Sequence, residues 1–325
     1  MLKDVMQASR RTLLALGAAA GLRAQPRRVR IGIAGGRFGA TFQWHLDPGC
    51  EVAAVCDAAP AGLERLAKTY GCANAYQSFH EMLKHPGLDA VGVFTPAPLH
   101  AEMTLAALRA GKHVICAVPA GLSVEELERI LDAVREAIGP EIYLGVDANG
   151  GWSPREAAQT IPRLLEFDLK FVEQPVPALD MAWMADVRTR TSLPVIADES
   201  IYTIQDAMAI ARTGAADVIS IYIGKGGGIG AGRKTAAIAE AAGLTCTIGS
   251  NLEMGIATAA MIHLGMAMPA INSEAFPCDI LSRFYYESDY LAEPLLVDAG
   301  SARPFEKPGL GVELDDEKVA YYRMG

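Results

Sequence analysis

The sequence lacks the features that mark several large classes of protein. No apolar run reaches the roughly 18 residues of an ordinary membrane span, so we expect none. Basic residues are outnumbered, 29 lysines and arginines against 38 acids, for a net charge of −9. This balance argues against nucleic-acid binding, because contact with phosphates needs a basic face. There is no P-loop and no Ser-His-Asp or Cys-His motif, which leaves nucleophilic hydrolysis unsupported.

Cysteine is also sparse and unpatterned, since the six cysteines form no CxxC pair. Cys56, Cys116 and Cys246 lie in apolar runs typical of strands, so we expect buried thiols rather than a disulfide or zinc framework. What is abundant is hydrophobic residues, at 51%, and glycine, with 32 residues. A chain of 325 residues with this composition predicts either one large α/β domain or two ordinary ones.

Residues 1–26 are set apart from the rest of the chain. The pair Arg10-Arg11 precedes a short, weakly apolar run and resembles a bacterial twin-arginine export signal. The resemblance implies export to the periplasm. The alternative is an uncleaved N-terminal helix in a cytoplasmic protein.

Residues 27–131 follow the pattern of a dinucleotide-binding domain. A predicted strand over 29–34 leads into a glycine turn that we expect to open a helix, and a second strand, 52–56, ends at Asp57. Gly36 and Gly39 would let the backbone approach a pyrophosphate, and Asp57 would accept hydrogen bonds from ribose hydroxyls. The motif predicts a Rossmann-like domain, with a plain strand-turn-helix as the alternative.

Further segments carry a resemblance to a known family. A strand over 89–94 precedes Thr95-Pro96 and His100, and Gly111-Lys112-His113-Val114 begins the next strand. Over about residues 28–131 the chain resembles the N-terminal domain of the Gfo/Idh/MocA oxidoreductases, which use NAD or NADP on substrates such as sugars and polyols. Ala117-Val118-Pro119 stands where that family has Glu-Lys-Pro, so its catalytic lysine is missing. The resemblance implies cofactor contacts from Gly36, Gly39, Asp57, Thr95, Pro96 and His100.

In the second half, acidic residues recur at strand ends. Asp147, Glu173 and Asp198 follow predicted strands 142–146, 169–172 and 195–197, at intervals of about 25 residues that match one βα unit. Strand ends of a (β/α) barrel converge on one face, where three unpaired anions would repel one another. A shared cation resolves this, and all-oxygen ligation favours Mg²⁺ or Mn²⁺. The alternative is that each acid is a separate loop residue or helix cap.

Residues 132–325 are therefore predicted to form a barrel domain, with more strands at 218–223, 245–248 and 271–273. Over about residues 134–325 the chain resembles the enolase superfamily, in its mandelate racemase/muconate lactonizing branch. The resemblance implies that Asp147, Glu173 and Asp198 bind Mg²⁺ while a base removes the proton beside a substrate carboxylate. The product class would be that of a dehydratase, racemase or cycloisomerase. The matching segments are 146–152, 172–175, 197–200, 224–229 and 249–255.

The catalytic residues of that branch are only partly matched. Its Lys-x-Lys base on the second barrel strand has no counterpart, and the lysine of its sixth strand falls on Tyr222, three residues before Lys225. Tyr222 would serve as an acid, because an ordinary phenol pKa of ~10 makes a poor base. Lys225 is either the base or a turn lysine, and Glu253 is a candidate acid or electrostatic group.

The expected fold class is α/β, with a Rossmann-like part followed by a partial or hybrid barrel. We favour an arrangement in which strands 89–94 and 113–117 join the six later strands to close an eight-stranded barrel, over two separate sheets. Three functions stay open: a metal-dependent lyase or isomerase, an NAD(P)-dependent oxidoreductase, and a fusion that binds without turnover. The expected partner is a small carboxylate or sugar acid, and homo-oligomer formation is left open.

Overall fold

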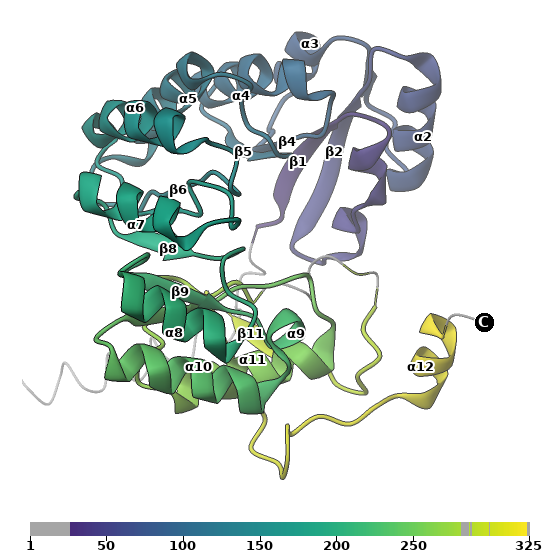
Figure 1. Ribbon diagram of the computed structural model, residues 1–325. Coiled ribbons are helices and arrows are strands. Elements are labelled where there is room, and N and C mark those ends of the chain that lie inside the picture. Colours follow the sequence, from purple (N-terminus) through teal and green to yellow (C-terminus); the bar gives the residue numbers. More distant parts are fainter. Residues whose placement is uncertain (1–26, 281–285, 287, 299, 324–325) are drawn as a thin grey trace, which may run out of the picture. The chain divides into compact units, whose positions relative to one another are not determined.

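The computed structural model describes residues 27–280, 286, 288–298 and 300–323 (Figure 1). The predicted export signal lies outside these residues and stays a prediction. The chain forms two compact units. The first contains the residues up to Ala40, Trp44–Thr95 and Lys112–Ile115, and the second contains Thr41–Gln43, Pro96–Gly111 and the chain from Cys116 onward. Each unit is described by itself.

The first unit is built on a five-stranded sheet with the order β3-β2-β1-β4-β5. The central strand β1 pairs in parallel with both β2 and β4, and its last four residues are buried. Helix α2 lies beside β2 (Figure 1). This doubly wound order confirms a Rossmann-like part. The elements are β1 (Val29–Ala34), β2 (Cys50–Cys56), α2 (Pro60–Tyr70), β3 (Ala75–Tyr76), α3 (Phe79–Leu83), β4 (Ala90–Val93) and β5 (His113–Cys116).

The expected helix after the glycine turn is wrong. Only two short 3₁₀ helices, η1 (Phe38–Thr41) and η2 (Trp44–Leu46), lie between β1 and β2. A four-residue 3₁₀ helix, η1, thus follows the glycine turn where an α-helix was expected, and the connection reaches β2 through a turn in which the Gly49 amide donates to Asp47 Oδ1 at 2.6 Å. The turn therefore lacks the α-helical N-terminus that would face a pyrophosphate.

The second unit contains a five-stranded parallel sheet with the order β10-β9-β8-β7-β6. A parallel bridge between Cys246 and Ile271 adds the position of the sixth predicted strand. Helices alternate with these strands, as Figure 1 shows for α6 to α10. The elements are β6 (Val146–Asp147), α6 (Pro154–Leu164), β7 (Val172–Glu173), α7 (Met181–Arg190), β8 (Val195–Ala197), α8 (Ile204–Thr213), β9 (Val218–Ile221), α9 (Ile223–Gly226), α10 (Ile229–Ala241), β10 (Thr245–Ile248) and α11 (Gly255–Ala267), with a fourth 3₁₀ helix, η4, at Leu165–Phe167.

Burial explains why these segments form one layer of strands covered by helices. The strand residues Val195, Ala197 and Ile219 are at most 1% exposed, as are the helix residues Met184 and Ile210. They belong to one continuous apolar cluster that spans the sheet and its helices. Strands covered in this way are apolar throughout, which is the pattern that the sequence shows.

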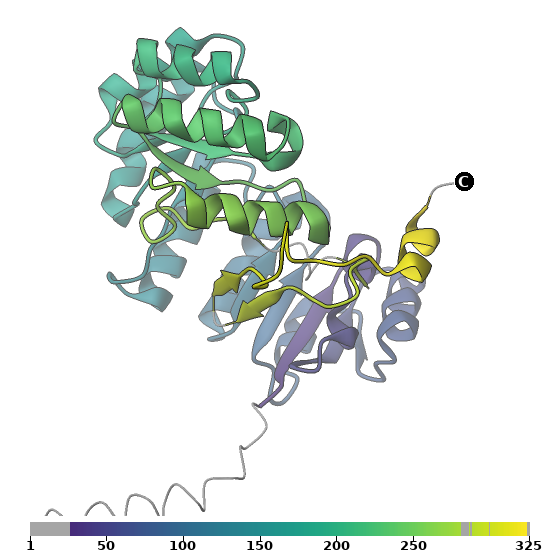
Figure 2. The ribbon, with the colours of Figure 1, turned by 90° about the horizontal axis from the view of Figure 1, so that it is seen from below.

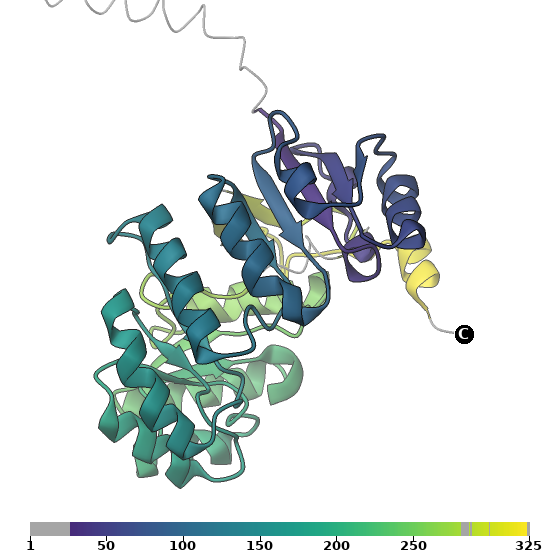
Figure 3. The same cartoon turned by 90° about the horizontal axis from the view of Figure 1, so that it is seen from above.

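Two helices before the sheet also belong to the second unit. Helix α4 (His100–Arg109) follows the 3₁₀ helix η3 (Ala97–Leu99), and it lies beside α5 (Val124–Ile138), as Figure 3 shows. Ala101, Leu105 and Ile130 are buried between them. The Ser123 side chain caps α5 by accepting from the Glu126 amide at 3.2 Å, as predicted. The last change from the first unit to the second comes at Cys116, so α5 belongs to the second unit together with α4.

The favoured eight-stranded closure is wrong. The strands that would complete the barrel, β4 and β5, are hydrogen-bonded neighbours in the first sheet, with β4 paired to β1. Once β4 has β1 on one side and β5 on the other, it has no free edge for a barrel strand. The second sheet is thus a partial barrel, which is the alternative arrangement of two separate sheets.

The C-terminal part of the second unit is a separate addition to the sheet. Strands β11 (Leu296–Asp298) and β12 (Ser301–Arg303) form an antiparallel pair, and α12 (Asp316–Tyr322) ends the described chain (Figure 2). Among the described residues, we find no helix with the length and apolar character needed to cross a membrane.

Candidate functional site

The three predicted metal ligands lie at neighbouring strand ends of the second unit. Asp147 of β6 pairs directly with Glu173 of β7, and Glu173 pairs with Ile196 of β8. Asp198 comes two residues after Ile196. Directly paired residues of parallel strands share a face of the sheet, which places Asp147 and Glu173 together, and Asp198 directly follows β8 at the same carboxyl edge. The charges of Asp147 and Asp198 both act on Glu173, so the three carboxyl groups lie close together.

These carboxyl groups influence one another's ionisation. The pKa of Glu173 is raised to about 8, first by burial and then by the charges of Asp147, Asp198 and Glu199, against a lowering by Lys225. Loss of surrounding water raises the pKa of the partly solvent-open Asp147 to about 6, with Glu199 and Asp198 acting in the same direction. The site therefore brings together acidic groups that raise one another's pKa values, and the protein's own cations only partly offset this effect.

Asp198 is the member of the three that has a cationic partner. The Lys225 ammonium donates to Asp198 Oδ1 at 2.6 Å and to the Asp198 main-chain oxygen at 2.9 Å, while the Tyr222 hydroxyl donates to Oδ2 at 2.7 Å. In the described part of the chain, no three His, Cys, Asp or Glu side chains are arranged so that they could hold a metal ion as they stand. At Asp198 the reason is that Lys225 and Tyr222 already occupy its two carboxylate oxygens.

The ring of Tyr222 packs directly against the backbone of Gly249, the residue that follows β10. A Cβ on Gly249, the residue after β10, would lie 2.1 Å from the Tyr222 ring, so only glycine leaves room for the ring. Burial first, then the hydrogen bond and the charge of Asp198, raise the pKa of Tyr222 far above its ordinary value. The phenol is therefore held in its protonated form with its hydroxyl directed at Asp198, which makes it a weak acid, and its predicted catalytic role stays a prediction.

Two amide side chains organise the acids, and the sequence prediction gave Gln174 no role. Gln174 is fully buried, and its Oε1 accepts from the amides of Asp198 at 3.0 Å and Ser200 at 3.2 Å. Asn149 donates to Asp147 Oδ2 at 2.7 Å and to Glu199 Oε1 at 3.2 Å. Both amides stand in the left-handed region, with φ of 30° for Gln174 and 44° for Asn149. Their signal in the sequence is their place just after the strand-end acids, Gln174 one residue after Glu173 and Asn149 two residues after Asp147, and the family resemblance implied a supporting role for Asn149 alone.

Glu253 lies in the loop after β10. Its Oε2 accepts from the Ser250 hydroxyl at 2.7 Å and from the Asn251 amide at 2.9 Å. Its Oε1 is buried, has no hydrogen-bond partner among the described residues, and lies 3.0 Å from where a Cβ on Gly224 would stand. Glu253 therefore sits against the one-turn helix α9 that carries Lys225. Its charge also adds to burial in raising the pKa of Asp279.

In the first unit, two of the residues predicted to contact a dinucleotide, Gly36 and Asp57, are hydrogen-bonded to each other. The Gly36 amide donates to Asp57 Oδ2 at 2.6 Å, and the Ala59 amide donates to Oδ1 at 2.7 Å. Gly36 also packs so closely on Gly62 of α2 that a Cβ would lie 2.2 Å from the Gly62 oxygen. Gly39 is buried. Two of the four lone-pair positions of the Asp57 carboxylate are thus taken, and two are left for a ribose.

The remaining cofactor candidates are divided between the units. Thr95 ends a segment of the first unit, whereas Pro96 and His100 belong to the second. His100 is 2% exposed, and its Nδ1 lies 2.8 Å from the Pro119 oxygen, within hydrogen-bonding distance. This is the environment of a structural histidine.

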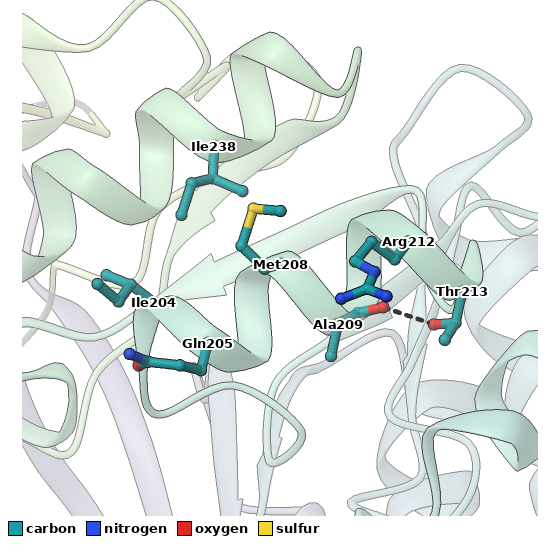
Figure 4. Close-up of a pocket in the computed structure, with 7 residues that line it drawn as sticks. All are labelled: Ile204, Gln205, Met208, Ala209, Arg212, Thr213 and Ile238. Carbon is teal, nitrogen blue, oxygen red and sulfur yellow. Dashed lines mark hydrogen bonds between the residues drawn. The ribbon is translucent and has the colours of Figure 1, made fainter.

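A hollow on the outer helical layer has none of this chemistry. It has a volume of about 520 Å³ and lies between α8 and α10, with Met208 and Ile238 facing it (Figure 4). Thr213 bonds back to the Ala209 oxygen at 2.7 Å. Arg212 is its only ionisable lining residue, so it carries no acid-base machinery.

The fold and the acids at its strand ends define the class of α/β barrel proteins with a carboxylate site at the carboxyl edge. Residues 95–319 match the family model described as enolase C-terminal domain-like, and the chain belongs to this family. Residues 29–139 match the model described as an oxidoreductase family with an NAD-binding Rossmann fold. Both predicted resemblances are thereby confirmed.

Known relatives in the muconate lactonizing branch match the second part of the chain. Muconate cycloisomerase 1 of Rhodococcus opacus is 36% identical over 186 residues, which cover 57% of this chain and 49% of the relative. N-succinyl-L-Arg/Lys racemase of Bacillus cereus is 33% identical over 200 residues, covering 61% and 53%. The crystal structure of 2-chloromuconate cycloisomerase from Rhodococcus opacus 1CP gives a TM-score of 0.61 at 30% identity, covering 73% of this chain and 64% of that one. The chain spans about half the length of the curated relatives it matches.

Proposed function

We propose that the second unit is a lyase or isomerase of the enolase type that uses a divalent cation, Mg²⁺ or Mn²⁺, held by Asp147, Glu173 and Asp198. Its reaction would be removal of the proton beside the carboxylate of a small organic acid or sugar acid. The observation that carries the proposal is the placement of three carboxylates at the carboxyl ends of adjacent parallel strands, with Asp147 and Glu173 in direct register.

The chemistry of the donors fits such an ion. All three are carboxylates, the ligands that hard divalent cations prefer. Burial first, and the neighbouring carboxylates after it, raise the pKa values of Asp147 and Glu173, and a cation bound here would favour their charged forms. Glu199 adds a buried Oε2 with no hydrogen-bond partner among the described residues. A cation bound here would hold a substrate carboxylate and make its adjacent proton more acidic.

The chain's own residues would divide the remaining work. Asn149 and Gln174 hold the acids in place through the hydrogen bonds described above. Tyr222 would hold Asp198 in place through its hydroxyl, and Glu253 would supply an acid or a negative charge. Lys225 is the amine near the reacting position. It is the candidate base of this site.

The relatives suggest which reactions to test. They are named for cycloisomerisation of muconates, racemisation of N-succinyl-Arg/Lys and epimerisation of L-Ala-D/L-Glu. All three groups of names describe small carboxylates. This supports the isomerase and lyase class for the present chain and supplies test compounds.

The experiment joins ion binding to proton exchange. Calorimetry should detect Mg²⁺ binding by the full chain and its loss in D147N. In D₂O with Mg²⁺, NMR of N-succinyl-L-arginine and of the dipeptide L-Ala-L-Glu should show loss of the α-proton signal with the wild-type chain and not with D147N. Unchanged Mg²⁺ affinity in D147N would refute the metal site, and ion binding without exchange would favour a fusion that binds without turnover.

NAD or NADP binding by the first unit is a second candidate. It is supported by the family match over residues 29–139 and by Asp57, which lies beside the glycine turn with two lone-pair positions free. Against it stands the short 3₁₀ helix η1, which follows that turn in place of an α-helix. An increase of NADH fluorescence with the wild-type chain and none with D57A would support binding, and equal signals would refute this role for Asp57.

A further inference from the structure

Lys225 is a mostly buried lysine whose ammonium group contacts both oxygen atoms and aromatic rings. Its side chain is 12% exposed and that of Asp198 is 9% exposed. Its ammonium contacts a carboxylate oxygen at 2.6 Å and a carbonyl oxygen at 2.9 Å. It also lies 3.7 Å from the centroid of the Tyr222 ring and 5.0 Å from that of Tyr202. Two oxygens and two ring faces therefore surround one cation.

The same lysine acts electrostatically on a second predicted ligand. Its charge lowers the pKa of Glu173, while every carboxylate near Glu173 raises it. The ammonium thus supplies to this cluster, through a flexible side chain, part of the positive charge that a divalent ion would supply. Only a helix of one turn, α9, positions it, and that helix follows β9 directly.

We infer that Lys225 is a tethered cation that occupies Asp198 when no metal ion is present, so that an incoming divalent ion must displace it. The inference rests on the proposed function, because it takes Asp198 as a ligand of that ion. Two consequences follow. Lys225 weakens ion binding by holding the site in a closed state, and ion binding exposes the Lys225 amine.

The first test compares K225Q with K234Q, which removes the same charge from an exposed position on α10. Calorimetry with Mg²⁺ alone should give K225Q an affinity at least about tenfold higher than wild type, since the competing cation is gone. K234Q should match wild type. Thermal unfolding in EDTA should show a lower Tm for K225Q only, and saturating Mg²⁺ should restore it.

The second test uses the wild-type chain, so it holds even if K225Q does not fold. Brief treatment with acetic anhydride, followed by peptide mass spectrometry, should modify Lys225 several times faster in Mg²⁺ than in EDTA. Lys234 in the same sample should react equally in both. Equal protection of Lys225 in both conditions would overturn the inference.

The outcomes separate the two proposals. If D147N abolishes Mg²⁺ binding but K225Q leaves the affinity unchanged or weaker, the metal site stands and the tethered cation is refuted. If neither wild type nor K225Q binds Mg²⁺, both proposals fail. Binding by K225Q alone would support both, with Lys225 excluding the ion from the wild-type chain.

Discussion

At the residue scale, a buried polar side chain of the second unit, Gln174, links two strand ends through hydrogen bonds. Gln174 is 0% exposed and uses both ends of its amide, donating to the Val176 oxygen and the Ser200 hydroxyl at 2.8 Å each. It accepts from the amides of Asp198 and Ser200. One side chain therefore ties the end of β7 to the end of β8.

Replacing Gln174 with alanine should destabilise the chain strongly. The substitution leaves several buried polar groups without partners, each costing about 1–3 kcal/mol. We expect a loss of about 3 kcal/mol in urea unfolding and weaker Mg²⁺ binding by calorimetry. Gln205, which is exposed on α8, is the matched control, and a Q174A loss as small as that of Q205A would contradict this role.

Glu173 is expected to lower the stability of the metal-free chain at high pH while contributing to Mg²⁺ binding. Its pKa is raised to about 8 from an ordinary value of 4.5, so the native state holds its proton more tightly than the unfolded state does. Without metal, stability should therefore fall as pH rises from about 4.5 to about 8. E173Q should remove this fall, giving a higher Tm than wild type at pH 8 and an equal Tm at pH 4.

The same variant should lose the stabilisation that Mg²⁺ brings to wild type, because it lacks one carboxylate of the proposed set. Thermal scans at both pH values, with Mg²⁺ and with EDTA, measure both effects. A Tm of E173Q below that of wild type in EDTA at pH 8 would contradict the electrostatic argument.

At the element scale, the short strands at the site are supported from outside the sheet. β6 and β7 each have two residues, too few to hold their register by ladder hydrogen bonds alone. Arg135 of α5 donates to the main-chain oxygens of Gly139 and Ile142, before β6, at 2.8 and 2.9 Å. It also donates to those of Phe167 and Asp168, before β7, at 3.0 and 2.9 Å. One helix residue thus aligns both strands.

R135A should therefore disturb the acids without touching them. Loss of four hydrogen bonds from a charged donor predicts a destabilisation of about 2 kcal/mol and a Tm lower by roughly 4–8 °C. Mg²⁺ affinity should fall as well, since Asp147 and Glu173 lose their register. R212A, on the exposed face of α8, is the control and should behave as wild type in both measurements.

At the scale of the whole molecule, each unit has its own sheet with a buried cysteine in it. The unfolding of each unit can therefore be followed through the reactivity of that cysteine. Burial raises the pKa of the Cys56 thiol in the first unit to about 11, and that of Cys246 in the second to about 12. At pH 8 neither native thiol should react with iodoacetamide, because the thiolate is the reactive form. With increasing urea, we expect the two thiols to become reactive at different midpoints, measured by mass spectrometry. Coincident midpoints would show that the units unfold as one.

The sequence by itself determined the local elements and the candidate chemistry. Strands Val195–Ala197 and Thr245–Ile248 and the Ser123 cap of α5 follow from apolar runs and short-range hydrogen bonding, and the structure has them as predicted. The period of the acids also comes from the chain alone, because one βα unit has a nearly constant length. These features depend on neighbours in sequence, so a single sequence carries them.

Only the tertiary structure decided which strands share a sheet and which side chain neutralises Asp198. β4 and β5 carry apolar patterns that suit either sheet, and their pairing depends on β1, some sixty residues earlier in the chain. Likewise, Lys225 reaches Asp198 across 27 residues, and Gln174 reaches it across 24. Pairings of this kind are settled by competition among distant segments for the same edge or the same charge, and the local pattern leaves that competition open.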